Sequence, residues 1–387
     1  MRKKLIVIAL PLLVAAAWSY AYYRTVKLDR ELNPVRQAPP YPVPAEVRAL
    51  HDRLLIADMH ADTLLWDRGL EKRSSRGHLD LPRMLDANEA LQIFTVVTKS
   101  PRHLNIERNG SDSDELTPAY IVRMKPPSTW FSLTARALDQ AQELQEAARR
   151  SGGRLVIVRS RADLESFLAR RRTDPRIAAG VLGIEGAHAL DGKLSNLDRL
   201  DRAGFRMIGM AHFFDNEFAG SAHGLEKYGL TAEGRALVRE MERRHILVDL
   251  AHASPQTIDD VLAVATRPVV VSHTGVRATC DNRRNLTDDQ LRRIAATGGV
   301  IGVGFWDVAT CGHDAPAIAR AIKHAVAVAG IDHVALGSDF DGSTDEPFDV
   351  TGLPLLTQAL MQEGFSEDEI ARIMGGNVIR LLRQTLP

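Results

Sequence analysis

Cysteine is scarce in this chain of 387 residues, which contains only Cys280 and Cys311. Two thiols are too few for a disulfide framework. They could form one bridge or none, and we expect none. Thiolate ligation of a metal ion is disfavoured for the same reason.

An excess of charge of either sign is also absent, because 49 basic residues balance 49 acidic ones. Nothing in this balance indicates a nucleic-acid partner. The composition, 45% hydrophobic and 25% charged, is that of an ordinary globular protein. The length fits one large domain of α/β-barrel size or two smaller domains, and no internal repeat or second domain is visible.

The first 23 residues are typical of a targeting segment, because the basic residues at positions 2–4 precede an apolar run from Leu5 to Trp18. Ser19 and Ala21 could form a cleavage site, whereas an apolar run extended to Tyr23 favours an uncleaved anchor. Residues 1–23 are therefore predicted to be a signal anchor or a signal peptide. The rest of the chain would face the periplasm from the inner membrane, or be soluble in the periplasm or secreted after cleavage.

A Pro-rich stretch, NPVRQAPPYPVP at residues 33–44, follows this segment and predicts a semi-rigid spacer. We expect residues 24–44 to be a linker and residues 45–387 to be one domain. Within that domain, short β-rich runs alternate with amphipathic helical patterns, which is typical of parallel βα units. About eight such runs predict a (β/α)8 TIM barrel; they begin at Leu54, Leu91, Ala178, Phe205, His245, Pro268, Gly299 and His333.

Helix starts separate most of these runs. The clearest is at residues 230–233, where Thr231 is the expected N-cap, and similar patterns occur at residues 286–289 and 366–369. The last helix is expected to run to about Leu382. The segment 99–130 is polar and irregular, and it predicts a long loop or lid after the second strand.

The predicted strands share a feature at their ends. The first run ends in His60 and Asp62, which point the same way because side chains alternate along a strand. Other runs end in a histidine or a carboxylate as well: Glu185, His212, His252, His273 and Asp339. The carboxyl ends of parallel barrel strands meet on one rim, where such folds carry out chemistry. We therefore expect a metal site there.

Imidazole and carboxylate ligands without thiolates suit Zn²⁺, and Mn²⁺, Co²⁺ or Fe²⁺ fit the same logic. Three histidines and three acids of this set already exceed what one catalytic zinc requires while it keeps an open position. Two metal ions that share a bridging carboxylate fit better. Such sites suit hydroxide attack on a carbonyl or phosphoryl centre.

Seven motifs in order resemble the membrane dipeptidase family, also called renal dipeptidase or peptidase family M19. They are HAD, GIEGAH, MAHFFDN, VDLAHAS, VVVSHTG, CDNRRNLTDD and GSDFDG, and with the intervening sequence they extend from His60 to about Asn377. The resemblance implies a zinc-dependent (β/α)8 barrel related to the amidohydrolases.

The resemblance also implies a ligand set. His60 and Asp62 would bind one zinc ion, and His252 and His273 would bind a second. Glu185 would bridge the two ions.

Further residues are implied to act on the substrate. Asp339 would lie beside the first zinc and shuttle a proton, although Asp341 could serve instead. His212 would contact the substrate carbonyl and stabilise the oxyanion. Arg284 would bind the free carboxylate of a dipeptide, with Arg283 as the alternative.

His223, in the SAHG sequence, is a further candidate for the pocket. The chain lacks the cysteines of the animal enzymes, so neither a disulfide-linked dimer nor a lipid tail is implied. The family is often dimeric, which leaves a homodimer open.

The expected activity is hydrolysis of L-Xaa-L/D-Xaa dipeptides with a free C-terminus, by a metallo-dipeptidase of EC 3.4.13 type. One alternative is a relative specialised for maturing a peptide natural product. Another is a non-catalytic binding protein, which predicts broken ligands, whereas all ligands are intact here. A phosphotriesterase or lactonase would usually show His-x-His at the first strand, where this chain has His-x-Asp.

Overall fold

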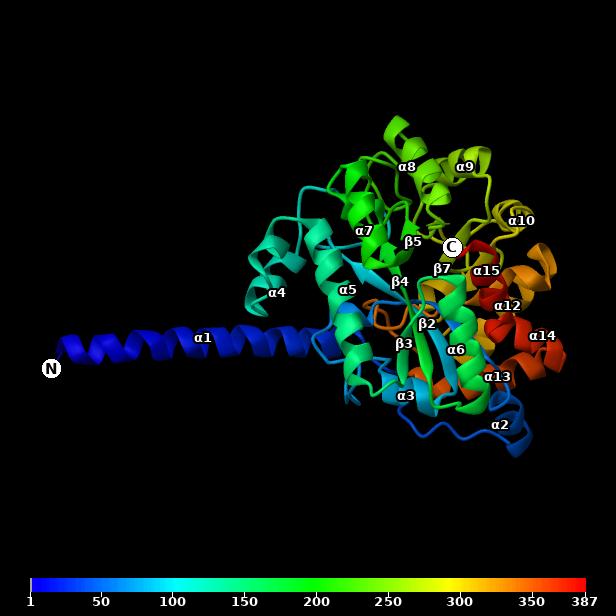
Figure 1. The fold of residues 1–387 in the computed structure, drawn as a ribbon, viewed down its shortest axis with the longest axis horizontal. Helices are drawn as coiled ribbons and strands as arrows, with labels where there is room; N and C mark the ends of the chain where they lie inside the picture. Colours follow the sequence, from blue (N-terminus) through cyan, green and yellow to red (C-terminus); the bar gives the residue numbers. More distant parts are fainter. Residues whose placement is uncertain (1) are drawn as a thin grey trace.

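Eight parallel strands close into a barrel with helices around it (Figure 1). The computed structural model describes residues 2–387, and the surroundings of side chains from residue 13 onward. Pairing of β2 with β4 completes the circle. The barrel strands are β1 (Ile56–Ala61), β2 (Glu89–Val97), β4 (Ala178–Glu185), β5 (Phe205–Gly209), β6 (Leu247–Asp249), β7 (Val270–Thr274), β8 (Val300–Val303) and β9 (Val334–Leu336). The predicted (β/α)8 barrel is confirmed.

A short ninth strand, β3 (Leu155–Ile157), lies outside this circle and was not predicted. It pairs with the first half of β4, where Leu155 is opposite Ala178. β5 pairs with the second half of β4 along the same edge.

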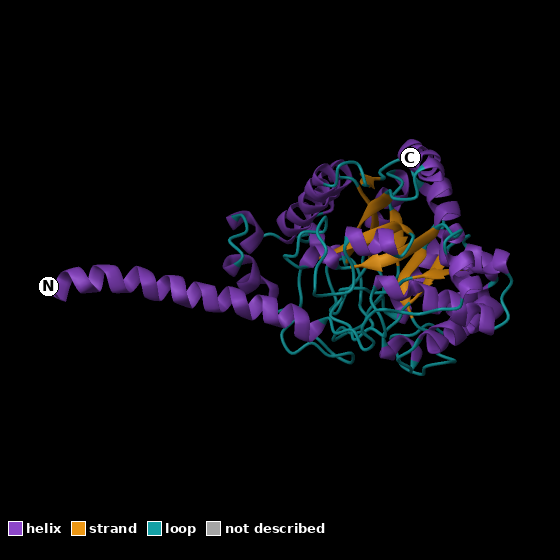
Figure 2. Cartoon of the chain, turned by 90° about the horizontal axis from the view of Figure 1, so that it is seen from below, coloured by secondary structure: helices purple, strands orange, loops and turns teal. Residues whose placement is uncertain are grey.

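Helices surround the strands on the outside, as Figure 2 shows. The longest of these is α5 (Leu133–Arg150). On α12 (Ala315–Ala329), the buried residues Ile318, Ile322 and Ala325 recur at the spacing of one helix face, which therefore packs on the barrel. The others are α2 (Ala45–His51), α3 (Leu81–Asp86), α4 (Leu116–Val122), α6 (Arg161–Thr173), α7 (Leu197–Ala203), α8 (Ala232–Arg243), α9 (Pro255–Val264), α10 (Asp288–Ala296), α11 (Asp307–Thr310), α13 (Leu353–Gln362), α14 (Glu367–Ala371) and α15 (Asn377–Thr385).

The predicted helix starts are present. The Thr231 hydroxyl accepts a hydrogen bond from the N–H of Gly234 at the start of α8. Thr287 and Ser366 form capping boxes at the starts of α10 and α14. The last helix is not continuous to Leu382, because a π-helical turn over residues 372–376 separates α14 from α15.

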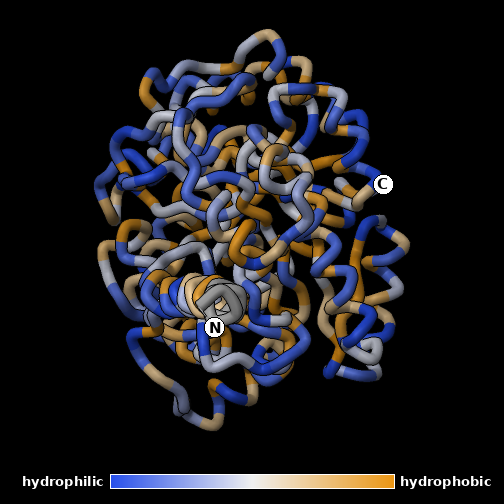
Figure 3. The backbone as a smooth tube through the Cα atoms, turned by 90° about the vertical axis from the view of Figure 1, so that its left-hand side faces the viewer, coloured by the Kyte–Doolittle hydropathy of each residue, from blue (hydrophilic) through white to orange (hydrophobic). Residues whose placement is uncertain are grey.

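The chain begins with one long helix, α1 (Arg2–Leu32), whose N-terminal end extends away from the barrel (Figure 1). Figure 3 looks along this helix from that end. Among the residues whose side chains the structure describes, 13–387, no helix combines the length with the apolar character that a membrane span requires. The anchor and the signal peptide therefore remain predictions.

The Pro-rich segment after α1 lies along the barrel. The N–H of Arg36 donates to the Glu346 carbonyl at 2.9 Å, and the N–H of Gln37 donates to the Pro347 carbonyl at 3.1 Å. Tyr41 is buried with its ring against that of Phe348. These contacts join the segment to the loop that follows β9.

The expectation that no disulfide forms is wrong, because Cys280 and Cys311 are bonded to each other. The two residues are 31 positions apart. They meet because Cys280 lies in the loop after β7 and Cys311 follows α11 after β8, and these strands are neighbours. The predicted lid at residues 99–130 is also more regular than expected, because it contains α4 and a 3-10 turn (Pro127–Trp130).

Candidate metal centre and substrate pocket

Seven predicted site residues meet at the carboxyl ends of the strands, and all are buried. They come from β1, β4, β7 and the segments that follow β1, β5, β6 and β9: His60, Asp62, Glu185, His212, His252, His273 and Asp339. The barrel topology explains this convergence, because parallel strands bring residues far apart in sequence to one rim.

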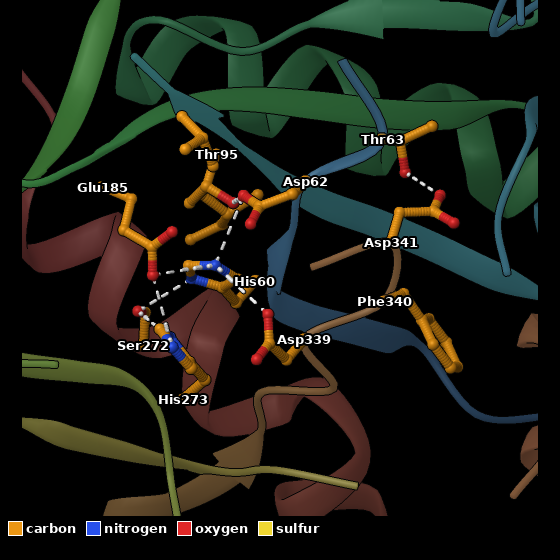
Figure 4. Close-up of polar contacts among 12 residues, drawn as sticks. His60, Asp62, Thr63, Thr95, Glu185, Ser272, His273, Asp339, Phe340 and Asp341 are labelled. Carbon is orange, nitrogen blue, oxygen red and sulfur yellow. Dashed lines mark hydrogen bonds and ion pairs between the residues drawn. The ribbon is translucent and has the colours of Figure 1, made fainter. Parts of the chain in front are cut away.

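His60 lies at the centre of three carboxylates (Figure 4). Its Nε2 atom is 3.4 Å from Asp62 Oδ1, 3.7 Å from Glu185 Oε1 and 3.8 Å from Asp339 Oδ1. This buried nitrogen has no hydrogen-bond partner among the described residues. Three acidic oxygens around one unpartnered imidazole nitrogen form a set that a divalent cation fits.

Glu185 also belongs to a second group. Its Oε1 atom is 3.0 Å from His252 Nε2 and 3.4 Å from His273 Nε2, and its Oε2 atom is 3.1 Å from His212 Nε2. The carboxylate therefore lies between the two sides of the cluster, where a bridging ligand would have to be.

Within the described part of the chain, three sets of ligand atoms each lie within 4.8 Å of one another: His60–Glu185–His273, Glu185–His212–His252 and His60–Asp62–Asp339. The second set includes His212, which was predicted to contact substrate instead. His212 therefore lies close enough to bind a metal ion or to contact the substrate carbonyl.

Burial and mutual repulsion raise the pKa values of two acidic groups in the cluster, Glu185 and Asp339. Burial raises the pKa of Glu185 well above its usual value, and the Asp62 charge adds to this. Burial likewise raises the pKa of Asp339 to about 8. For His60, burial lowers the pKa, but the carboxylates of Asp62, Glu185 and Asp339 outweigh it and raise the pKa to about 10. The positive charge that the protein itself supplies is too small to keep these acids in their ionised form.

The other histidines are held neutral. Burial, reinforced by neighbouring cationic groups, lowers the pKa of His212, His252 and His273 well below the usual value. A neutral imidazole offers a lone pair to a metal. Neutral imidazoles beside undercompensated carboxylates are the donor set that a pair of divalent cations needs.

One serine holds two of these histidines. Ser272 Oγ donates to Asp249 Oδ2 at 2.6 Å and lies 3.0 Å from both His60 Nδ1 and His273 Nδ1. Because its one proton goes to Asp249, the hydroxyl accepts from both rings. In the neutral form of each ring, the nitrogen that faces Glu185, Nε2, is then the one without a proton. No sequence pattern indicated Ser272 or Asp249, although both lie in motifs that carry predicted ligands.

Of the two acids in the last motif, Asp339 faces the cluster and Asp341 points away (Figure 4). Asp341 accepts hydrogen bonds from Thr63 Oγ1 and from the His78 N–H, each at 2.7 Å, and pairs with Arg68 at 2.8 Å. The Asp341 carboxylate therefore stabilises the surrounding loops and does not take part in the site.

Of the two adjacent arginines, Arg284 reaches the site. Its Nη2 donates to the His273 carbonyl at 2.9 Å and lies 3.4 Å from His252 Nε2, and its guanidinium is 5.6 Å from the Trp306 ring centre. Arg283 instead pairs with Glu107 at 2.9 Å on the surface.

A cavity of about 480 Å³ opens above the cluster. Asp62, Glu185, His212, Arg284 and Asp339 line its inner part, and the candidate His223 lines it too. His223 is fixed by a 2.7 Å contact between Nδ1 and the Ile106 carbonyl. The outer part is largely apolar.

Two segments outside the barrel line the cavity, and only one of them was predicted from the sequence. The predicted lid supplies lining residues such as Ile106 and Tyr120. The helix α1 supplies Thr25, Leu28 and Leu32, which no sequence signal indicated.

A barrel with this rim defines a metal-dependent hydrolase of TIM-barrel type. The sequence model of membrane dipeptidase (peptidase family M19) matches residues 44–386, and the chain belongs to this family. It is therefore a metallo-dipeptidase, a hydrolase that acts on peptide bonds.

Individual relatives agree with this assignment. The chain is 32% identical over 323 residues to an uncharacterized dipeptidase of Schizosaccharomyces pombe, covering 80% of this chain and 72% of the relative. It is 28% identical to the dipeptidase AC of family M19, with a TM-score of 0.70 and coverage of 86% and 99%. It is also 28% identical to a metallopeptidase of Rhodobacter sphaeroides liganded with a phosphinate mimic of L-Ala-D-Ala, with a TM-score of 0.68 and the same coverage.

Proposed function

We propose that this protein is a binuclear zinc dipeptidase that hydrolyses dipeptides with a free C-terminal carboxylate. The observation that carries the proposal is the position of Glu185, whose two oxygens lie within 3.7 Å of His60, His212, His252 and His273 nitrogens. One carboxylate between two ligand groups is the arrangement that a pair of metal ions requires.

The ligands divide between the two sides of this carboxylate. His60 and Asp62 would hold one ion, with Asp339 beside it, and His252 and His273 would hold the other. When bound, two zinc ions supply a hydroxide nucleophile at neutral pH and polarise the scissile carbonyl.

The remaining groups act on the dipeptide. The Arg284 guanidinium offers a planar fork to the terminal carboxylate. His212, whose pKa is lowered by burial, is a neutral donor that can stabilise the oxyanion. The Asp339 carboxyl can carry a proton to the departing amine. A cavity of about 480 Å³ closed by Arg284 suits a dipeptide better than a longer chain.

The location outside the cytoplasm is part of the proposal. The basic and apolar N-terminal pattern supports export, either with retention in the inner membrane or with release into the periplasm. The Cys280–Cys311 disulfide supports it independently, because such bonds persist in oxidising compartments.

The test combines zinc content with hydrolysis by the full-length chain. The substrates are a panel of dipeptides, including L-Ala-D-Ala, the matching tripeptides and the dipeptide amides. We expect about two zinc ions per chain, turnover of the free dipeptides much faster than that of the tripeptides and the amides, and loss of both properties in Glu185→Ala.

Glu89→Ala is the matched control. Glu89 is equally buried, but it lies at the start of β2, at the opposite end of the barrel from the cluster. This variant should keep its zinc and its activity. Two zinc ions without turnover of any dipeptide would remove the proposed substrate and favour a specialised relative. One zinc ion or none in a folded wild-type chain would refute the bridging role of Glu185.

A further inference from the structure

The outer wall of the substrate cavity is made in part by the N-terminal helix. Thr25, Leu28 and Leu32 of α1 line the same cavity as Asp62 and Glu185. Their spacing of three and four residues places them on one helix face. Leu28 lines the cavity and is 46% exposed, so a substrate can contact it.

A buried ion pair fixes which face of α1 is presented. Asp29 is 1% exposed, and its Oδ2 atom lies 2.8 Å from Arg76 Nη1. Arg68 lies 3.8 Å away on the same oxygen. Asn33 Nδ2 donates to Asp29 Oδ1 at 3.1 Å. A buried carboxylate paired with the charges of two arginines sets the rotation of the helix and therefore the direction of Leu28.

The helix is also joined to the catalytic loop after β9. Asn33 Oδ1 accepts from the Ser343 N–H at 3.0 Å, four residues beyond Asp339. Arg68 contacts both Asp29 and Asp341. On the other side, Tyr22 Oη donates to Asp67 at 3.0 Å. Because these contacts begin at Tyr22, cleavage after Ala21 would leave them intact.

The position of α1 around the rim shows which part of a dipeptide it would contact. α1 packs against α4, which follows β2, and its contacts involve the segments after β1 and β9 (Figure 1). Arg284 and Trp306 follow β7 and β8. With the terminal carboxylate at Arg284, the α1 wall faces the amino-terminal residue of the substrate.

We propose that residues 25–32 of α1 form a specificity-determining wall that binds a large apolar side chain on the amino-terminal residue of the dipeptide. This inference rests on the proposed dipeptidase function. Contact with Leu28 removes apolar surface of both partners from water, so truncation of Leu28 should weaken selection for such substrates about tenfold.

The experiment compares kcat/KM for Leu-Ala, Ala-Leu and Ala-Ala in the full-length wild type and in Leu28→Ala. We expect Leu28→Ala to lose about tenfold on Leu-Ala and to keep its values on Ala-Ala and Ala-Leu. Tyr23→Ala is the control, because Tyr23 is 58% exposed on α1 and does not line the cavity. It should match the wild type on all three substrates.

A second variant tests the same wall without removing atoms. Leu28→Trp should narrow the cavity and reduce turnover of Leu-Ala more than that of Ala-Ala. Unchanged ratios in both Leu28 variants would overturn the inference and leave the dipeptidase function standing. A loss confined to Ala-Leu would overturn the assignment to the amino-terminal residue. A wild type that hydrolyses no dipeptide would overturn the proposed function and the inference together.

Discussion

A single buried hydroxyl sets the state of two neighbouring histidines, His60 and His273, which both face Glu185 Oε1. Ser272 accepts from the Nδ1 atoms of His60 and His273 while it donates to Asp249. Asp249 also accepts from the Ser272 N–H at 2.8 Å, so the serine is held at both its backbone and its side chain. Groups of this kind orient metal ligands and fix their tautomers.

Ser272→Ala should therefore weaken zinc binding by about 10–100-fold, because both rings lose the partner that keeps their Nε2 atoms free. Competition with a chelator of known affinity measures this without reference to activity. Ser254→Ala is the matched control, since Ser254 is also fully buried but caps α9 and contacts no imidazole. It should lower stability and leave zinc affinity unchanged. Equal zinc affinity in Ser272→Ala and wild type would contradict the role.

Arg284→Met should reduce kcat/KM for a free dipeptide by about 10²-fold, through loss of a charge-assisted bond to the terminal carboxylate. The value for the dipeptide amide, which carries no such charge, should stay the same. Arg283→Met provides the comparison, because Arg283 pairs with Glu107 at the surface. Equal losses on acid and amide would show that Arg284 has a structural role instead.

The positions of the site residues were accessible from sequence because each follows a predicted strand. The sequence did not show which of two neighbouring acidic residues faces the site. Asp339 and Asp341 have the same spacing pattern, and only the contacts of Asp341 with Thr63 and Arg68 separate them. The role of Ser272 depends on side-chain directions across adjacent strands, which no pattern within one strand contains.

At the scale of elements, a histidine joins α2 to its neighbours. His51 Nδ1 lies 2.8 Å from Thr357 Oγ1 of α13, and its Nε2 lies 2.9 Å from the Ala87 carbonyl after α3. Burial lowers the pKa of His51 to about 4. The folded chain therefore holds this ring neutral at pH values where the unfolded chain protonates it.

This difference makes stability depend on pH. Between about pH 6.5 and 4 the unfolded state binds the extra proton, so the free energy of unfolding falls as the pH is lowered through this window. The largest contribution is about 3 kcal/mol. Urea unfolding of His51→Gln across this range should show a flatter dependence than the wild type. His313→Gln, at an exposed histidine, should retain the wild-type slope. Parallel curves for His51→Gln and wild type would contradict this account.

Regular elements were predictable where their patterns were long. The eight barrel strands and the caps at Thr231, Thr287 and Ser366 are confirmed. The strand β3 was not predicted because no histidine or carboxylate directly follows Leu155–Ile157, whereas the equally short β6 and β9 lie in longer runs that end near His252 and Asp339. The break between α14 and α15 was not predicted because the apolar periodicity of the sequence continues across it.

At the scale of the whole molecule, the missed features are all contacts between distant segments. α1 reaches the cavity, residues 36–37 bond to the loop after β9, and Cys280 meets Cys311. None follows from composition or from local periodicity, because each depends on how segments distant in the sequence pack against the rim of the barrel. The barrel was predictable as a class, whereas the parts that attach to its rim were not.

The disulfide belongs to this scale because it joins two loops that line the cavity. Cys280 lies four residues before Arg284, and Cys311 follows the helix that begins after Trp306. Asn285 ties the same loops together, donating to the carbonyls of Val308 at 3.0 Å and Ala309 at 3.2 Å. The bond therefore reinforces a contact that also exists without it, and its removal should loosen the loops and leave the barrel folded.

The double variant Cys280→Ser/Cys311→Ser should lose about 3–4 kcal/mol of unfolding free energy, from the freedom that its unfolded chain gains. Its KM for free dipeptides should rise more than its kcat falls, because Arg284 becomes less well positioned while the metal ligands stay in place. Denaturant unfolding and steady-state kinetics measure the two effects. Reductant should shift the wild type toward the variant and leave the variant unchanged. A wild type that is indifferent to reductant, with a variant of equal stability and equal KM, would show that the bond neither stabilises the fold nor positions Arg284.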